Sequence, residues 1–195
     1  IPGTPPRSAI QVGENIRLDA DGKTLIATRA GKVHLAAGRI LILDVVQIPG
    51  DVDFSTGNID AHTDVLVAGT VRDTFAVKSS KNVAVRGAIE AARVEAAGDV
   101  HVSGGIAGRG KGCVIAGGTI ATKFCSDARL QAAGDVTVSR ECFNCRVHAG
   151  GRLVMSRGKL VGGFAYARQG AEIKFLGNQT ERPTEIAIGL DPADA

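Results

Sequence analysis

The feature that most constrains the fold of this chain is an irregular repeat of apolar residues through its middle. Two interleaved series lengthen and shorten together, each with successive steps of 18, 17, 20, 16 and 17 residues. The first series is Val65, Val83, Val100, Ile120, Val136 and Leu153, and the second is Ile59, Val77, Val94, Val114, Leu130 and Val147. A shared step indicates that one structural unit is repeated. The similar phrases AAGDVHVSGG (96–105) and AAGDVTVSRE (132–141) then lie two units apart.

Within each unit, apolar and polar residues alternate, as in VEA, VHV, LQA and VTV. Alternation with a period of two is typical of a half-buried strand, and no apolar stripe with helical spacing occurs. Units of this length hold about three short strands and their turns. Such units cannot bury their inner faces alone, so they must stack on one another. We therefore expect an all-β protein, a right-handed parallel β-helix of six to seven coils. A left-handed hexapeptide helix would need strict six-residue spacing.

Stacking places equivalent residues of successive coils in columns. Ala61, Ser79, Ala96, Ala116, Ala132 and Ala149 are predicted to form an inward column of small residues. Asp60, Lys78, Glu95, Ile115, Gln131 and His148 are predicted to form an outward column. A second outward column contains Arg93, Arg129 and Arg146, with Cys113 between the first two.

The flanks of the repeat differ from its middle. Residues 14–48 read as an antiparallel β region in which NIRL, TLIAT, VHL and the run RILILDVVQI are strands, and the Asp-Gly turn within DADGK is a hairpin signal. We expect an N-terminal β cap region over 1–50, the β-helix over 51–177, and a C-terminal strand, TEIAIGL, with a tail over 178–195. A cap would cover strand edges that an open coil leaves unpaired.

Composition narrows the class of protein. Hydrophobic residues make up 44% of the 195 residues but aromatic residues only 4%, so the core consists of many similar aliphatic layers. The net charge is +3, without a basic block or an apolar run long enough to span a membrane. We expect no nucleic-acid partner and no membrane-spanning segment. Four cysteines in a chain this long favour a reducing cytoplasm over a secreted disulfide framework.

The stretch GIAGRGKG at 105–112 has the glycine and lysine spacing of a phosphate-binding loop. That loop requires Ser or Thr after the lysine and a helix after the loop. Here Gly112 follows Lys111, and the next segment, CVIAGG, reads as a strand. We therefore predict a turn in the longest coil and no nucleotide site.

The cysteines raise the question of a metal site, because CFNC and His148 give the spacing C-x2-C-x2-H. Cys145 is predicted to share the inward face of Val147, whereas His148 points outward, so the ligands diverge and we expect no metal. Cys125 and Cys142 lie five residues before Leu130 and Val147. They are predicted to stack on adjacent coils with Cα atoms about 5 Å apart, as free buried thiols.

No catalytic constellation stands out in the sequence. The four histidines, at 34, 62, 101 and 148, have no Ser/Asp or paired-carboxylate partners in an evident arrangement. The column of Arg93, Arg129 and Arg146 could bind a polyanion, or could consist of ordinary surface arginines. We assign no catalytic, cofactor-binding or metal-ligating residue, and no cofactor.

Several stretches resemble the flagellar assembly protein A family: GDVDFSTGNIDA (50–61), VAGTV (67–71), RGAIEAARVEAAGDVHVSGGIAGRGKG (86–112), IAGGTIATKF (115–124), GKLVGGFAYA (158–167) and TEIAIGLDP. The upstream GENIRLDADGKTLIA (13–27) resembles the region before that family's β-helix. The resemblance covers roughly residues 8–192, and VDFSTGNID is its most specific stretch. It implies a cytoplasmic bacterial protein linked to flagellar assembly or placement, without established catalytic residues. Family members usually carry further N- and C-terminal regions, so we expect this chain to be part of a longer protein.

Three functions are compatible with these observations. The first is a non-enzymatic scaffold or protein-interaction module with an unidentified protein partner. The second is a self-polymerising rod like the bactofilins, which would make the chain a homo-oligomer. The third is a polysaccharide-binding or polysaccharide-cleaving β-helix.

Overall fold

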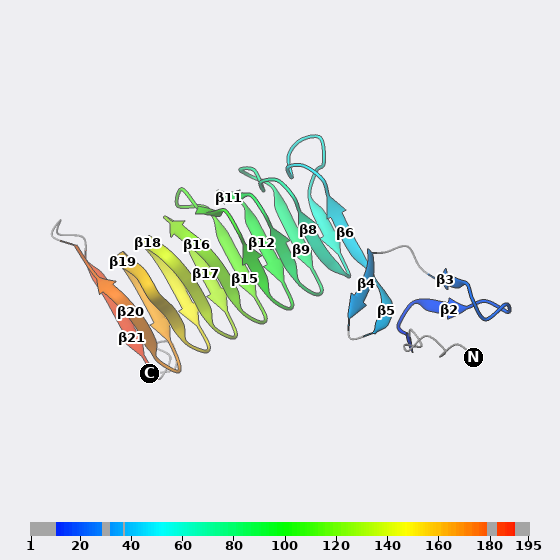
Figure 1. The fold of residues 1–195 in the computed structure, drawn as a ribbon. Helices are drawn as coiled ribbons and strands as arrows, with labels where there is room; N and C mark the ends of the chain where they lie inside the picture. Colours follow the sequence, from blue (N-terminus) through cyan, green and yellow to red (C-terminus); the bar gives the residue numbers. More distant parts are fainter. Residues whose placement is uncertain (1–10, 29–31, 37, 179–182, 190–195) are drawn as a thin grey trace. The chain divides into compact units, whose positions relative to one another are not determined.

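The computed structural model describes residues 11–28, 32–36, 38–178 and 183–189. The chain forms two compact units, residues 1–45 and 46–195. Every regular element among the described residues is a β-strand, as the alternation of apolar and polar residues predicted (Figure 1).

The first unit is small and mostly antiparallel. Its strands are β1 (Gln11–Val12), β2 (Ile16–Leu18), β3 (Leu25–Ala27), β4 (Lys32–Ala36) and β5 (Arg39–Leu43). Strands β2 and β3 form the predicted hairpin, and β4 and β5 pair antiparallel, with β1 added in parallel to β5. In the hairpin turn the Asp21 carboxylate accepts hydrogen bonds from the backbone N–H groups of Lys23 (2.8 Å) and Thr24 (2.9 Å). The hydroxyl and backbone N–H of Thr24, together with the backbone N–H of Lys23, lower the pKa of Asp21. That this unit caps the β-helix stays a prediction.

The run RILILDVVQI does not belong wholly to this antiparallel region, as the sequence had suggested. Its second half is β6 (Val45–Ile48), which pairs with β8 (Asp64–Val67) in the second unit. The carbonyl of Ile48 accepts a hydrogen bond from the N–H of Ala68 at 2.9 Å. The expectation was wrong for residues 45–48 because an apolar run gives no information on which partner strand satisfies its backbone groups.

The second unit is a parallel β-solenoid with three faces. The first face contains β6, β8, β10 (Val83–Val85), β13 (Val100–Val102) and the starts of β16 (Ile120–Ser126), β18 (Val136–Ala149), β19 (Leu153–Ala167) and β20 (Ala171–Leu176). The second contains β11 (Ala88–Glu90), β14 (Gly105–Ala107) and later parts of β16, β18, β19 and β20. The third contains β7 (Ile59–Ala61), β9 (Ala76–Ser79), β12 (Arg93–Ala96), β15 (Cys113–Ala116), β17 (Arg129–Ala132), the ends of β18 and β19, and β21 (Thr184–Ile188).

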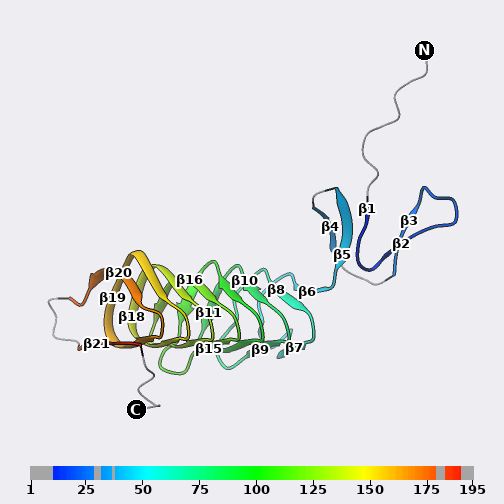
Figure 2. The ribbon, with the colours of Figure 1, turned by 90° about the horizontal axis from the view of Figure 1, so that it is seen from below.

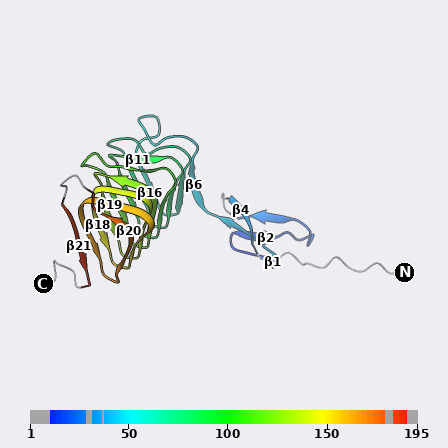
Figure 3. The same cartoon turned by 60° about the vertical axis from the view of Figure 1, so that its left-hand side comes forward.

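The solenoid has about eight turns, from β6 to β20 along the first face, rather than the six to seven expected. Figure 2 shows the first and third faces along opposite sides of the stack, and Figure 3 shows β18 to β21 together at its last turns. The extra turns come from the two ends of the repeat. Strand β6 begins the first turn. At the other end, β21 pairs in parallel with β19, although Ile186 follows its partner Ala165 by 21 residues, a longer step than any in the repeat. The segment TEIAIGL is therefore the strand predicted, and it continues the third face.

The two apolar series form the core as predicted. Every member of the first series is at most 1% exposed, and Val100 pairs in register with Val83 and Ile120. The inward column from Ala61 to Ala149 is also buried throughout. Because parallel strands repeat the same position from coil to coil, each layer packs on a residue of similar size and shape.

The repeated phrase AAGDV forms the corner between the third and first faces. There the carboxylates of Asp99 and Asp135 accept hydrogen bonds from the backbone N–H groups of Thr119 and Arg152, both at 2.7 Å. A side chain at Gly151 would collide with the carboxylate of Asp135. The repeat is therefore structural, since each coil needs the aspartate to satisfy the next coil's N–H and needs a glycine to accommodate it.

Candidate functional site: a basic hollow on the third face

An outward column of arginines crosses the third face, as the sequence predicted. Arg93 of β12 pairs with Cys113 of β15, which pairs with Arg129 of β17, which pairs with Arg146 of β18. All three arginines are exposed and Cys113 is half-buried. The parallel strands space successive side chains about 4.8 Å apart, so Arg129 and Arg146 are immediate neighbours.

The glycine-rich turn lies beside this column. Residues 108–112 link β14 to β15, with Arg109 and Gly110 at positive φ angles of 49° and 77°. The turn and the column together line an open hollow of about 430 Å³, which we call the basic hollow. Its lining residues are Arg93, Gly110, Lys111, Gly112, Cys113, Asp127, Ala128, Arg129, Asn144 and Arg146.

Most of the positive charge in the basic hollow has no partner. Arg93 forms an ion pair with Glu95, but Lys111, Arg129 and Arg146 form no ion pair with any described residue. The described residues that line the hollow include one carboxylate, Asp127, which accepts a hydrogen bond of 2.6 Å from the side-chain amide of Asn144. The hollow therefore has an excess of positive charge on a rigid sheet.

The glycine-rich stretch forms the predicted turn, and its geometry differs from that of a phosphate-binding loop. That it binds no nucleotide stays a prediction. Its N–H groups are already used: Gly110 donates to the carbonyl of Asp127 (2.8 Å), while Lys111 and Gly112 donate to the carbonyl of Gly108 (2.9 and 2.7 Å). A phosphate-binding loop must point several free N–H groups at its ligand. Strand β15, rather than a helix, follows the turn.

Lys111→Ala tests this interpretation. We expect the free energy of unfolding to change by less than about 0.5 kcal/mol, because the side chain is exposed and unpaired. Isothermal titration of the wild-type chain with Mg-ATP should give no micromolar binding. A micromolar dissociation constant that disappears in Lys111→Ala would show that the turn does hold a nucleotide.

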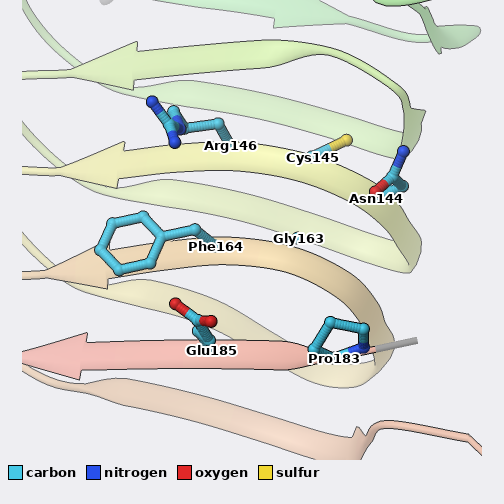
Figure 4. A pocket seen from close by; sticks show the side chains of 7 residues that line it. All are labelled: Asn144, Cys145, Arg146, Gly163, Phe164, Pro183 and Glu185. Carbon is cyan, nitrogen blue, oxygen red and sulfur yellow. The ribbon is translucent and has the colours of Figure 1, made fainter. Parts of the chain in front are cut away.

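A second open hollow, of about 470 Å³, lies further along the same face. Figure 4 shows its lining residues on the later parts of β18 and β19, on β21 and just before β21: Asn144, Cys145, Arg146, Gly163, Phe164, Pro183 and Glu185. Arg146 pairs in register with Phe164, and Phe164 with Glu185. Arg146 therefore belongs to both hollows.

The cysteines follow the predicted register. Cys125 and Cys142 are paired on adjacent turns, both are buried, and all four cysteines are free. Cys145 is buried as well, whereas His148 points outward and stacks against Tyr166 with ring centroids 4.7 Å apart. His148 therefore points away from the cysteines of C-x2-C-x2-H, as expected.

Sequence reasoning missed one convergence among the cysteines. The sulfur atoms of Cys125, Cys142 and Cys145 lie within 4.8 Å of one another. Hydrogen bonds from the thiols of Cys125 and Cys142 lower the pKa of Cys145 to about 4. Hydrogen bonding with the other two thiols and burial raise the pKa of Cys125. The signal was present in the stacking of Cys125 on Cys142, combined with the inward position predicted for Cys145.

The comparison with known families agrees with this geometry. The family model described as the flagellar assembly protein A beta solenoid domain matches residues 44–195. The chain belongs to the flagellar assembly protein A family. The match begins one residue before β6, the first strand of the solenoid. No curated protein and no solved structure matches the chain.

The sites of this member of the flagellar assembly protein A family contain no evident catalytic set. Among the described residues that line them, each hollow has a single carboxylate, Asp127 in one and Glu185 in the other, whereas glycoside cleavage generally uses a pair. Of the histidines, His62 contacts the hydroxyl of Ser80 at 3.2 Å and His148 stacks on Tyr166. The His34 side chain lies outside the described residues. Among the described residues no helix has the length and apolarity to cross a membrane.

Proposed function

We propose that this solenoid is a non-enzymatic scaffold that binds an acidic protein partner during flagellar assembly or placement, in the bacterial cytoplasm. Membership of the flagellar assembly protein A family supports the link to the flagellum. The fold supports a scaffold, because side chains fill the interior and the two hollows described above are open to solvent.

The observation that carries the proposal is the set of three unpaired cations around the basic hollow. Lys111, Arg129 and Arg146 are exposed and have no ion-pair partner among the described residues. Arg129 and Arg146 extend from paired strands about 4.8 Å apart, so their like charges repel one another. A complementary acidic surface would relieve that repulsion, and it would meet side chains already fixed in spacing by the sheet.

The proposal is tested by a charge reversal in the bacterium that carries the chain. We expect Arg129→Glu with Arg146→Glu to reduce the number of flagella per cell, or to displace them, as strongly as deletion of the whole gene. Electron microscopy of stained cells provides the count. The free energy of unfolding of the purified variant should stay within about 0.5 kcal/mol of wild type, since both side chains are exposed.

The matched control is Arg86→Glu with Arg157→Glu, which changes the net charge equally. Both arginines are exposed and lie outside the basic hollow. Control cells should have wild-type flagella. Normal flagella in cells that carry the folded Arg129→Glu, Arg146→Glu protein would contradict the proposal.

A second candidate function, self-assembly into a rod, is favoured by the last turn of the solenoid. Among the described residues β20 and β21 pair only with β19, and Phe175, Leu176 and Ile188 are 56–58% exposed on them. An unpaired edge with exposed apolar side chains is suited to pairing with another copy. Filaments of the purified chain in electron micrographs, abolished by Ile188→Lys, would support this function instead.

A further inference from the structure

Three buried thiols meet at one corner of the solenoid, between the second and third faces. Cys125 is the second-last residue of β16, on the second face, while Cys142 and Cys145 lie on either side of the corner in β18. Each is at most 2% exposed. Their sulfur atoms lie within 4.8 Å of one another, and three points so spaced always lie within about 2.8 Å of a common point, which is the largest separation divided by √3.

We propose that Cys125, Cys142 and Cys145 form a three-sulfur binding site for copper(I). Metal–sulfur bonds to d10 ions are about 2.3 Å long. Each sulfur therefore needs to move by no more than about 0.5 Å toward the common point, which small side-chain rotations supply. The site is independent of the proposed scaffold function and departs from our expectation, drawn from C-x2-C-x2-H, that the chain binds no metal.

The number and kind of ligands select copper(I) over zinc. Among the described residues no His, Asp or Glu joins the three sulfurs. The carbonyl of Phe143, beside the cluster, already accepts hydrogen bonds from Cys145 (3.3 Å) and from the N–H of Asp127 (3.0 Å). Zinc almost always takes four ligands in structural sites, whereas soft thiolates select copper(I) among their preferred ions.

Binding must also remove the thiol protons. Copper(I) binds cysteine as the thiolate, so each of the three thiols must give up its proton. Copper(I) would take the place of the three thiol protons, and these three protons would pass to solvent. The product, one cation and three thiolates, has a charge of −2, whose burial costs free energy. Arg146, the residue after Cys145, and its neighbour Arg129 place positive charge on the outer side of the same sheet.

The structure provides a route to the site. Cys145 lines the second open hollow, next to Gly163, which has no side chain to close the corner (Figure 4). Ile106 and Leu160 lie above and below Cys125 and Cys142 in the same inward column, so apolar side chains would shield a bound ion from water.

The test is an anaerobic titration of the reduced chain with copper(I) in competition with a chromogenic copper(I) chelator. We expect one copper(I) per chain, and X-ray absorption of the loaded protein should show three sulfur neighbours. Cys125→Ala, Cys142→Ala and Cys145→Ala should each weaken binding by at least about 100-fold, since loss of an outer-shell contact alone costs 10–100-fold. Cys113→Ala, which removes the half-buried cysteine of the arginine column, is the matched control and should bind as wild type.

The wild-type measurements keep the test decisive if a variant fails to fold. Copper(I) binding no tighter than that of the triple variant C125A/C142A/C145A would overturn the proposal. Two sulfur neighbours in the absorption spectrum, an equal loss in Cys113→Ala, or tighter binding of zinc than of copper(I) would overturn it as well.

Discussion

Val100→Asp is expected to abolish cooperative unfolding of the solenoid or to lower its stability by at least about 3 kcal/mol. Val100 is 1% exposed and lies between Val83 and Ile120 in the inward column. The described side chains around it are aliphatic, so a carboxylate there would be buried without a hydrogen-bond or charge partner. Thermal and urea unfolding followed by circular dichroism measure the loss.

The matched control is His101→Asp, one residue further along β13. His101 is exposed and pairs with Ala84 and Ala121 on the outer side of the same strands. The His101→Asp variant introduces the same carboxylate in the same turn of the solenoid, and its free energy of unfolding should stay within about 0.5 kcal/mol of wild type. If both variants unfold like wild type, burial of Val100 in the inward column does not contribute the expected free energy of unfolding.

Gly163→Ala is expected to destabilise the last turns of the solenoid by about 3 kcal/mol or more, for two reasons. The first is the φ angle of +82°, which costs an L-residue about 1–2 kcal/mol. The second is steric: an added Cβ would collide with the carbonyl oxygen of Cys145 and lie 2.8 Å from its backbone nitrogen. That backbone belongs to the paired strand β18 and cannot move without breaking the ladder.

Gly110→Ala separates these two contributions. Gly110 has a similar φ angle of +77°, but nothing lies within 4 Å of an added Cβ. The Gly110→Ala variant should therefore lose only the stability that the positive φ angle costs an L-residue, about 1–2 kcal/mol. Thermal unfolding of both variants gives the comparison, and an equal loss in the two would mean that close packing at Gly163 contributes nothing.

Much of the solenoid could be predicted from the sequence because its information is local and repeated. The steps between apolar residues determine which residues stack, so the pairing of Cys125 with Cys142 and of Arg129 with Arg146 was predicted correctly. Alternation within each strand then separates inward from outward positions, which placed Cys145 inside and His148 outside. The ends of the repeat were harder, because β6 and β21 lie where the step is interrupted.

The candidate sites were harder to predict than the core, because their residues meet at corners of the solenoid rather than within one column. The residues of one column follow from the number of residues per turn alone. A corner instead brings together residues of two faces, and the distance between them depends on the backbone angles of the turn. Lys111 joins the arginines because the turn at 108–112 takes positive φ angles at Arg109 and Gly110. Asn144, with a φ angle of 49°, likewise lies at the corner where β18 passes from the second face to the third, between Cys142 and Cys145. A local sequence pattern does not predict positive φ angles in residues other than glycine, such as Arg109 and Asn144.

The sequence by itself determined the class of fold and the register of the coils, because a repeated step and alternating polarity specify which residues of successive short strands stack on one another. The family followed separately from stretches such as VDFSTGNID, which resemble its members. The tertiary structure alone decided which side chains meet across a corner. It joined Cys145 to Cys125 and Cys142, and it placed Lys111 beside Arg129 and Arg146. The physical reason is that stacking repeats every residue at a nearly constant distance, while each corner angle depends on a few backbone dihedrals that packing of the whole coil selects.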